Sequence, residues 1–463
     1  MFRLALLSVM TFVAAVILPT NILSSARGAN AAEAPDDGPL AKYVAKADAS
    51  YKWTKRREGE VAGAKFVELT LTSQTWRETV WRHQLFVLRP ASVSADAKHA
   101  MLFITGGKWT DDLAGPAGEG DKLPKETPLF IALAEQLKTP VAILLQVPQQ
   151  PILGGRYEDD AIAETFVNFM KTGDAEWPLL LPMVKSAVRA MDATQELAAK
   201  EWKLDLKEFT ITGASKRGWT TWLTGAVDPR ATAIAPMVID MLNTAEQMKH
   251  QVETWGKPSE QIADYTRRGL QDHLASEPGK ALNLIVDPYS YRKRLTQPKL
   301  IMLGTNDRYW PLDALNLYWD GLEGEKYILY IPNNGHGLKD VARISGSLAA
   351  LHRRVVENKP LPKLSWKLDT RDEGLSLAVE SDIKPKEVRI WMAKSRTKDF
   401  RDSQWTSRIA KRGDDAFSYE LSTPTEGYAA MFGEAEYNGE SAPFYFSTNV
   451  RIIGNAAAAG GGK

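Results

Sequence analysis

Three side chains, a serine, an aspartate and a histidine, carry the chemistry that this sequence suggests most directly. Ser215 lies in ITGASKRG (residues 211–218), Asp307 in GTNDRYWP (304–311) and His336 in PNNGHG (332–337). A serine hydroxyl becomes an effective nucleophile when a neighbouring base accepts its proton, and histidine is the side chain best suited to that task near neutral pH. A carboxylate can hold the imidazole in the required tautomer. The three residues therefore indicate acyl transfer through a Ser-His-Asp triad.

Each of the three candidates follows a segment that is typical of a buried strand. These segments are FTIT (209–212), KLIMLG (299–304) and KYILYI (326–331). A strand followed by a sharp turn and a helix can expose a serine at the carboxyl edge of a sheet, with small residues on either side. Gly213 fits the first small position, but Gly218 comes one residue later than G-x-S-x-G requires. The alternative is an ordinary strand-to-helix junction at which Ser215 only caps the helix.

The order Ser, Asp, His along the chain is that of α/β-hydrolases. Asp307 is the acid that we prefer, and Asp240 and Asp313 are its rivals. An oxyanion hole needs two backbone N–H groups. Lys216, directly after the serine, is one candidate, and Gly107 or Lys108 in TGGKW (105–109) is the other.

Several aromatic and basic residues are candidates for binding a substrate. We expect Arg217 to pair with a buried acid and Lys216 to reach solvent, and the alternative is that both meet an anionic substrate group. Aromatic side chains could line a pocket for a sugar or an apolar acyl group, although such residues are more often part of the core. The substrate-binding candidates are Trp109, Arg217, Trp177, Tyr309 and Trp310, with Tyr157 and Trp255 as further aromatic residues.

The segments around these candidates predict an α/β fold. Buried-strand runs at 99–105 and 140–146 enclose a helical stretch at 129–137, and the alternation of strand and helix recurs through residue 358. This alternation of strands and helices is typical of a mostly parallel sheet with flanking helices, here an α/β-hydrolase fold over residues 32–360. Two long inserts, at about 148–182 and 242–295, interrupt it. Because long inserts in compact domains are usually functional, we interpret both as a lid.

The pattern changes near Pro360-Leu-Pro362. From residue 361 to 452 only short alternating segments remain, which predicts a C-terminal all-β domain, an Ig-like sandwich. The closing AAAAGGGK (456–463) has low complexity, and we expect residues 453–463 to be disordered. The role of this second domain stays open at this stage.

Composition narrows the class of protein. The formal net charge is +1, so no charged field favours nucleic acid as a partner. Cysteine is absent and the six histidines are scattered, so we expect neither a bound metal nor a cofactor. Residues 1–31 have the charged start, apolar run and A-x-A pattern of an export signal, with cleavage near Ala31. A retained membrane anchor is the alternative; after cleavage we expect no membrane contact.

Several stretches together resemble the PhoPQ-activated pathogenicity-related family. They are GASKRGWTTWL, AIAPMVIDMLN, TGDAEWPLLLPMVKSAVRAMD, VPQQP, GTNDRYW and PNNGHGL, and the resemblance extends from Tyr43 to Ile452. It implies export and an α/β-hydrolase fold, and it says little about the substrate. The turn at Ser215, with a basic residue after the serine, is also similar to that of glucuronoyl and acetylxylan esterases.

The sequence as a whole predicts an exported serine hydrolase, periplasmic or secreted, that acts as a carboxylesterase without a cofactor. Its substrate would be a small-molecule, carbohydrate or peptide ester. A serine peptidase on the same fold is one alternative. A non-catalytic secreted binding or signalling protein that keeps a hydrolase scaffold is another. Substrate identity and oligomeric state stay open.

Overall fold

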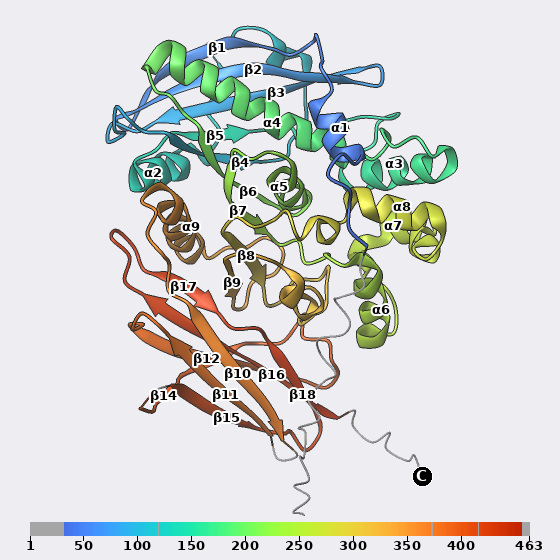
Figure 1. Cartoon of the computed structure of the whole chain (residues 1–463), viewed down its shortest axis with the longest axis vertical. Coiled ribbons are helices and arrows are strands. Elements are labelled where there is room, and N and C mark those ends of the chain that lie inside the picture. The colour runs from blue at the N-terminus through green and yellow to red at the C-terminus, as the bar shows by residue number, and fades with distance from the viewer. Residues whose placement is uncertain (1–31, 119, 372–373, 415, 456–463) are drawn as a thin grey trace, which may run out of the picture.

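A computed structural model describes residues 32–118, 120–371, 374–414 and 416–455 (Figure 1). The predicted export signal, residues 1–31, lies outside the described residues, as do residues 456–463 of the predicted tail. Within the described residues the chain builds one large sheet with helices on both faces, followed by two smaller sheets at its C-terminal end. No helix in these ranges is long and apolar enough to span a bilayer.

The large sheet is mixed, and within the described residues five of its neighbouring strand pairs are parallel and three are antiparallel. Its strand order is β1-β2-β3-β5-β4-β6-β7-β8-β9. The first three strands run antiparallel to their neighbours, and all pairs from β5 to β9 are parallel. The bounds are β1 Lys52–Val61, β2 Ala64–Trp76, β3 Thr79–Arg89, β4 His99–Ile104, β5 Val141–Leu144, β6 Glu208–Ala214, β7 Ala231–Met237, β8 Lys299–Gly304 and β9 Lys326–Ile331.

Helices cover both faces of this sheet because successive strand residues point to opposite sides. On β8, Ile301 and Leu303 pack toward one core cluster, and Leu300 and Met302 toward the other. The first cluster contains the apolar faces of α4 (Leu180–Leu197) and α5 (Lys216–Val227). The second contains those of α2 (Thr127–Leu137) and α9 (Val341–Val356). A short helix, α1 (Pro39–Ala45), packs on α4. β6 lies inside the sheet between β4 and β7, so its carboxyl end is enclosed by neighbouring loops.

The two predicted lid inserts contain helices rather than structureless chain. The first insert forms α3 (Glu158–Thr172) and the start of α4. The second forms α6 (Thr244–Trp255), α7 (Ala263–Thr266) and α8 (Glu277–Val286), joined by short 3-10 turns. In Figure 1, α3, α6, α7 and α8 gather on one side of the molecule. We call these four helices and their turns the cap.

The C-terminal part forms two antiparallel sheets that pack on each other. Gly433 of β16 faces Val379 and Leu377 of β11 so closely that a Cβ at Gly433 would meet their methyl groups. One sheet has the order β10-β11-β15-β14, and the other joins β13-β12-β16-β17 with β18 beside β16. The bounds are β10 Leu364–Arg371, β11 Gly374–Ser381, β12 Glu387–Ser395, β13 Thr406–Ile409, β14 Lys411–Arg412, β15 Phe417–Ser422, β16 Gly427–Tyr437, β17 Phe444–Ser447 and β18 Arg451–Asn455. The Ig-like connectivity stays a prediction, and the last strand reaches three residues beyond the expected end of the domain.

The C-terminal sheets lie directly against the large domain. Ser447 of β17 accepts a hydrogen bond from the amide of Tyr330 in β9, and the rings of Phe446 and Tyr327 stack at 4.6 Å. Ser347 of α9 exchanges hydrogen bonds with the backbone of Tyr445. The two parts are therefore joined by hydrogen bonds between serine hydroxyls and backbone groups and by stacked rings, as well as by the connecting chain.

Candidate active site

The turn between β6 and α5 holds Ser215 in an unusual backbone conformation. Its φ of 59° and ψ of −125° lie in a region that non-glycine residues rarely adopt. The amide of Ser215 donates to the carbonyl of Met237 at 2.9 Å, which fixes the turn to β7. This geometry is that of a strand-turn-helix elbow, in which the serine side chain stands clear of the sheet.

The two glycines around Ser215 are required by close backbone approach. A Cβ at Gly213 would lie 2.8 Å from the carbonyl oxygen of Arg217. A Cβ at Gly218 would lie 2.7 Å from the carbonyl oxygen of Met237 and 2.8 Å from a methyl of Ile239. The crowded position on the helix side is therefore residue 218, where α5 passes over the end of β7. This explains why the second glycine is one residue later than in G-x-S-x-G.

Ser215, His336 and Asp307 form one hydrogen-bonded line. The Oγ of Ser215 lies 2.8 Å from Nε2 of His336, and Nδ1 of His336 lies 2.8 Å from Oδ2 of Asp307. The three residues follow β6, β9 and β8, whose carboxyl ends meet at one edge of the sheet. An ionised carboxylate accepts only, so Nδ1 donates to Asp307 and Nε2 is free to accept the serine proton. The arrangement therefore places a hydroxyl, a base and an orienting acid in sequence.

The acid and the imidazole are both held in place by further contacts. Oδ1 of Asp307 accepts a hydrogen bond from the amide of Tyr309 at 3.0 Å. The ring of Tyr309 stacks on the imidazole of His336, with 4.2 Å between centroids. Asp307 and Tyr309 thus fix the imidazole from its edge and from its face.

The two rival acids have other partners. Asp313 accepts a hydrogen bond from Nε2 of His250 at 2.7 Å. Asp240 is buried and accepts a hydrogen bond from the hydroxyl of Tyr318 at 2.7 Å. Burial raises the pKa of Asp240 to about 8. Neither acid contacts His336, so Asp307 is the carboxylate of the line.

The three backbone amides that are candidates for the oxyanion hole have no acceptor in the described part of the chain. Within the described part of the chain, the N–H groups of Lys216, Gly107 and Lys108 donate to no protein atom. Lys216 begins α5, where the helix dipole also favours negative charge. Gly107 has a φ of 129°, which glycine adopts readily. These amides are available to a developing negative charge, and their role as an oxyanion hole stays a prediction.

Arg217 and Lys216 are both engaged with acids of α3. Arg217 makes two hydrogen bonds to Glu158, at 2.8 and 2.7 Å, and lies so close to Gly106 that a Cβ there would be 2.4 Å from its guanidinium. Burial alone would raise the pKa of Glu158, but the hydrogen bonds and charge of Arg217 outweigh it and hold that pKa below its ordinary value. Lys216 donates to Asp159 at 2.7 Å. The expectation that Lys216 reaches solvent is therefore wrong, because α3 covers it.

A cavity of about 110 Å³ opens beside Ser215 and His336, under the cap. Tyr309 and Trp310 line it, and their role in substrate binding stays a prediction. Most of the remaining wall is apolar and comes from α3, α5, α6, α7, α8 and the loop after β7. The apolar lining residues are Phe166, Met170, Trp219, Val238, Ile239, Met241, Met248, Ile262, Leu270, Leu274, Leu282 and Val286.

Three of the predicted substrate-binding residues do not line this cavity. Trp177 packs edge to face on Trp76, with Arg77 over its ring, because the chain before α4 returns to the β2–β3 hairpin. Trp109 is buried in the loop after β4, and its amide donates to Gln150. Arg217 is occupied by Glu158. The sequence alone does not indicate whether such a tryptophan packs in the core or lines the cavity.

The residues that sequence reasoning missed are the cap's side of the cavity, among them Phe166, Met170 and Tyr265. A signal for part of this surface exists in the sequence. Ala161, Ile162, Phe166 and Phe169 recur at helical spacing, which indicates an amphipathic helix within the first insert. The side to which that helix turns its apolar face depends on the rest of the fold.

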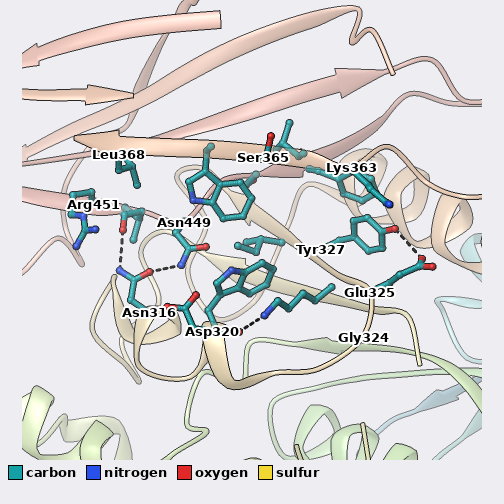
Figure 2. A pocket seen from close by; sticks show the side chains of 18 residues that line it. Asn316, Asp320, Gly324, Glu325, Tyr327, Lys363, Ser365, Leu368, Asn449 and Arg451 are labelled. Carbon is teal, nitrogen blue, oxygen red and sulfur yellow. Dashed lines mark hydrogen bonds between the residues drawn. The ribbon is translucent and has the colours of Figure 1, made fainter. Parts of the chain in front are cut away.

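A second, larger cleft of about 730 Å³ lies between β9 and β10, on the boundary with the C-terminal sheets. Figure 2 shows its lining, which includes Asn316, Tyr327, Lys363 and Asn449. It borders the amino end of β9, whereas His336 follows the carboxyl end of the same strand. This cleft is therefore separate from the serine, histidine and aspartate. Across the described residues, no cluster of three or more acids and histidines is arranged to hold a metal ion.

The sheet order and the elbow define the class of fold. A mixed sheet with crossover helices, whose serine, acid and histidine follow separate strands at one edge, is an α/β-hydrolase-like architecture.

The chain belongs to the PhoPQ-activated pathogenicity-related protein family, whose model matches residues 40–401, and the resemblance inferred from sequence is thereby confirmed. Autocrine proliferation repressor protein A of Dictyostelium discoideum is 33% identical over 435 residues, an alignment that covers 86% of each chain.

Among solved structures, acetyl xylan esterase 1 from Thermoanaerobacterium sp. JW/SL YS485 matches with a TM-score of 0.47 and 14% identity, over 72% of this chain and 99% of that one. A glucuronoyl esterase from Solibacter usitatus matches with a TM-score of 0.39 and 13% identity, over 68% and 91%. Similarities at this level carry no statement about substrate.

Proposed function

We propose that the protein is an exported serine hydrolase that cleaves carboxylic esters through an acyl-enzyme. The observation that carries this proposal is the line from Ser215 through His336 to Asp307, with both hydrogen bonds at 2.8 Å. Export is supported by the pattern of residues 1–31, with a cut near Ala31.

In the first half-reaction, the Oγ of Ser215 bonds to the ester carbonyl carbon while its proton passes to Nε2 of His336. The carbonyl electron pair moves to oxygen, which the amides of Lys216 and of Gly107 or Lys108 would stabilise. The bond to the alcohol then breaks, and His336 returns the proton to the departing oxygen. Water repeats the sequence on the acyl-enzyme, which releases the acid and restores the Ser215 hydroxyl.

The test is labelling with a fluorophosphonate probe together with turnover of p-nitrophenyl esters. We expect wild-type protein to label and turn over, and Ser215→Ala to do neither while its melting curve stays close to that of wild type. Turnover by the folded Ser215→Ala variant at the wild-type rate refutes the proposal. Equal cleavage of aminoacyl amides would favour the peptidase alternative.

A second candidate function follows from the name of the relative in Dictyostelium discoideum, a repressor of proliferation. On this hypothesis the chain acts as a secreted signal, and its hydrolase scaffold serves recognition. The two functions separate in one comparison. A growth-repressing activity that the Ser215→Ala protein retains in full favours signalling without catalysis, and loss of that activity with loss of turnover ties the signal to hydrolysis.

A further inference from the structure

The cavity beside Ser215 has the chemistry of an apolar binding site. Its walls carry methionine, leucine, isoleucine and aromatic side chains from both the sheet domain and the cap. Phe166 meets Trp219 edge to face at 6.0 Å and Tyr265 at 6.1 Å, which closes one side of the cavity. The lining also contains the polar residues Thr244, Thr266, Gln271 and Asn283, but apolar side chains outnumber them. A sugar ring would need a partner for each buried hydroxyl, because burying a hydroxyl without one costs free energy.

The charged groups that line the cavity are already paired with each other. Asp159 accepts from the ammonium of Lys216 at 2.7 Å and from the hydroxyl of Tyr265 at 2.9 Å. The ammonium also lies 5.9 Å from the centre of the Tyr309 ring. Lys216 therefore faces an acid and an aromatic ring, and it offers no unpaired cation to an anionic substrate.

The volume limits the group that can enter. A cavity of about 150 Å³ suffices for benzene, and this one measures about 110 Å³. We propose that the site takes esters in which one side is a short apolar chain of about four carbons, seated between Ser215 and the cap. This inference rests on the proposed esterase function and names its substrate class. The short hydrocarbon chain could belong to the acid or to the alcohol of the ester, since both present the same apolar surface to the cavity.

Chain-length series test the proposal and separate the two sides. One series varies the acyl chain of p-nitrophenyl esters from acetate to dodecanoate, and the other varies the alcohol of acetate esters. Each buried methylene adds about fourfold in affinity, so we expect the two methylenes between two and four carbons to raise kcat/KM about 15-fold on the seated side. Beyond six carbons it should fall. A flat dependence on length in both series overturns the proposal.

A filled-cavity variant provides the matched control. Met248 of α6 lines the cavity, and Val252 lies one turn further along the same helix, 47% exposed and outside the lining. Met248→Trp should abolish the preference for four carbons over two, whereas Val252→Trp should leave it unchanged. Met170→Trp on α3 repeats the test should the first variant fail to fold.

Binding to the Ser215→Ala protein distinguishes failure of this inference from failure of the proposed function. Calorimetric titration with p-nitrophenyl butyrate should give clear binding that p-nitrophenyl acetate lacks, and Met248→Trp should remove it. Binding of this kind without any wild-type turnover would sink the esterase proposal and leave the apolar site standing. Turnover with no discrimination between the two esters would sink the inference alone.

A different observation carries a second inference, which concerns the C-terminal domain. The loops that hold Asp307 and His336 are bonded to each other and to one segment of that domain, residues 399–405. Asn306, directly before Asp307, donates its side-chain amide to the carbonyls of Arg401 and Ser403, at 3.2 and 2.7 Å. The backbone amide of Asn306 donates to the carbonyl of Asn334 at 2.9 Å. The acid loop is therefore fixed from two directions.

The histidine loop is held by the same segment. The side chain of Asn333 donates to the carbonyl of Trp405 at 3.0 Å and accepts from its amide at 2.7 Å. Arg401 also pairs with Glu260 at 3.0 Å and lies 4.2 Å from the centre of the Trp255 ring, so the segment reaches the cap as well. Residues 399–405 thus touch all three parts that surround Ser215.

We infer that Asn306 and Asn333 are positioning residues, through which the C-terminal domain sets the distance between Asp307 and His336. A small displacement of a catalytic group can lower kcat about 100-fold. Asn306→Asp removes the donated hydrogen bonds at nearly constant shape. We expect it to lower kcat at least tenfold with little change in KM, and to displace the acidic limb of the kcat–pH profile.

The control is another asparagine at the boundary with the C-terminal sheets. Asn316 donates to the carbonyl of Val450 at 3.0 Å and accepts from Asn449 at 2.6 Å, in the separate cleft (Figure 2). Asn316→Asp should lower the melting temperature without altering kcat or its pH profile. The inference is overturned when Asn306→Asp and Asn316→Asp affect stability alike and neither changes the pH profile. Asn333→Asp should behave like Asn306→Asp and provides a second test.

Discussion

Replacing Asp307 with asparagine tests the role of the acid with the least change in shape. Asp307 accepts from Nδ1 of His336 through one oxygen and from the amide of Tyr309 through the other. The side-chain oxygen of the asparagine would keep the hydrogen bond from the amide of Tyr309. The NH2 group of the asparagine then faces His336. Nδ1 must then accept, and Nε2 carries the proton and can no longer take one from Ser215.

The expected loss follows from that reversed tautomer. The same change at the acid of a serine protease lowers kcat about 10⁴-fold. We expect a loss of about 10³- to 10⁴-fold here, equivalent to about 4–5 kcal/mol of transition-state stabilisation. KM should change little because Asp307 does not line the cavity. Initial rates with p-nitrophenyl butyrate measure the effect, and thermal melting checks that the variant is folded.

Asp313 provides the matched control on the same loop. It is also a partly buried aspartate bonded to a histidine, but its partner is His250. Asp313→Asn should therefore keep kcat within a few-fold of wild type. A loss below tenfold in folded Asp307→Asn, or an equal loss in both variants, would refute the assignment of Asp307.

Three further perturbations test other parts of the structure. Gly218→Ala forces a Cβ to within 2.7 Å of the Met237 carbonyl and should lower the free energy of unfolding in urea by about 1–3 kcal/mol. A Gly218→Ala protein as stable as wild type would contradict the close approach. Tyr309→Ala removes the ring stacked on His336 and should lower kcat about tenfold, whereas Tyr309→Phe should keep it; equal kcat in both variants would exclude a role for stacking. Burial lowers the pKa of His83 to about 4, so the folded protein keeps this histidine neutral while the unfolded chain protonates near pH 6.5. The neutral His83 therefore contributes fully to the free energy of unfolding above pH 6.5, and about 3 kcal/mol of this contribution is lost as the pH falls toward 4. Urea denaturation at pH 7, 5.5 and 4 measures this loss. The free energies of unfolding of wild type and His83→Gln should converge as the pH falls.

The order of strands and loops could be predicted from the sequence because it depends on local patterns. Ser215, Asp307 and His336 each follow a run of apolar residues, and parallel strands bring their carboxyl ends together. Tyr309 and Trp310 come directly after Asp307, so chain connectivity alone takes them to the same edge. The position of Trp177 could not be predicted, since it depends on where the β2–β3 hairpin lies.

The contacts of the C-terminal domain were beyond sequence reasoning for a different reason. Asn306 and Asn333 bind backbone groups about 70 to 100 residues away. Every residue has a backbone carbonyl, so the residue types in the sequence do not indicate which carbonyl accepts the bond. The partners of Lys216 were equally hidden, because Asp159 is one of three acids that begin α3 and helical spacing does not say which one faces the elbow.

The fit between Arg217, Glu158 and Gly106 has a consequence for how this family diverges. Losing the acid alone leaves a guanidinium covered by protein and without its counter-ion, and giving residue 106 a side chain alone drives it into that guanidinium. A change at only one of the three positions therefore destabilises the protein until the other positions change as well. We expect the trio to be inherited or replaced together, so that these three distant positions covary within the family.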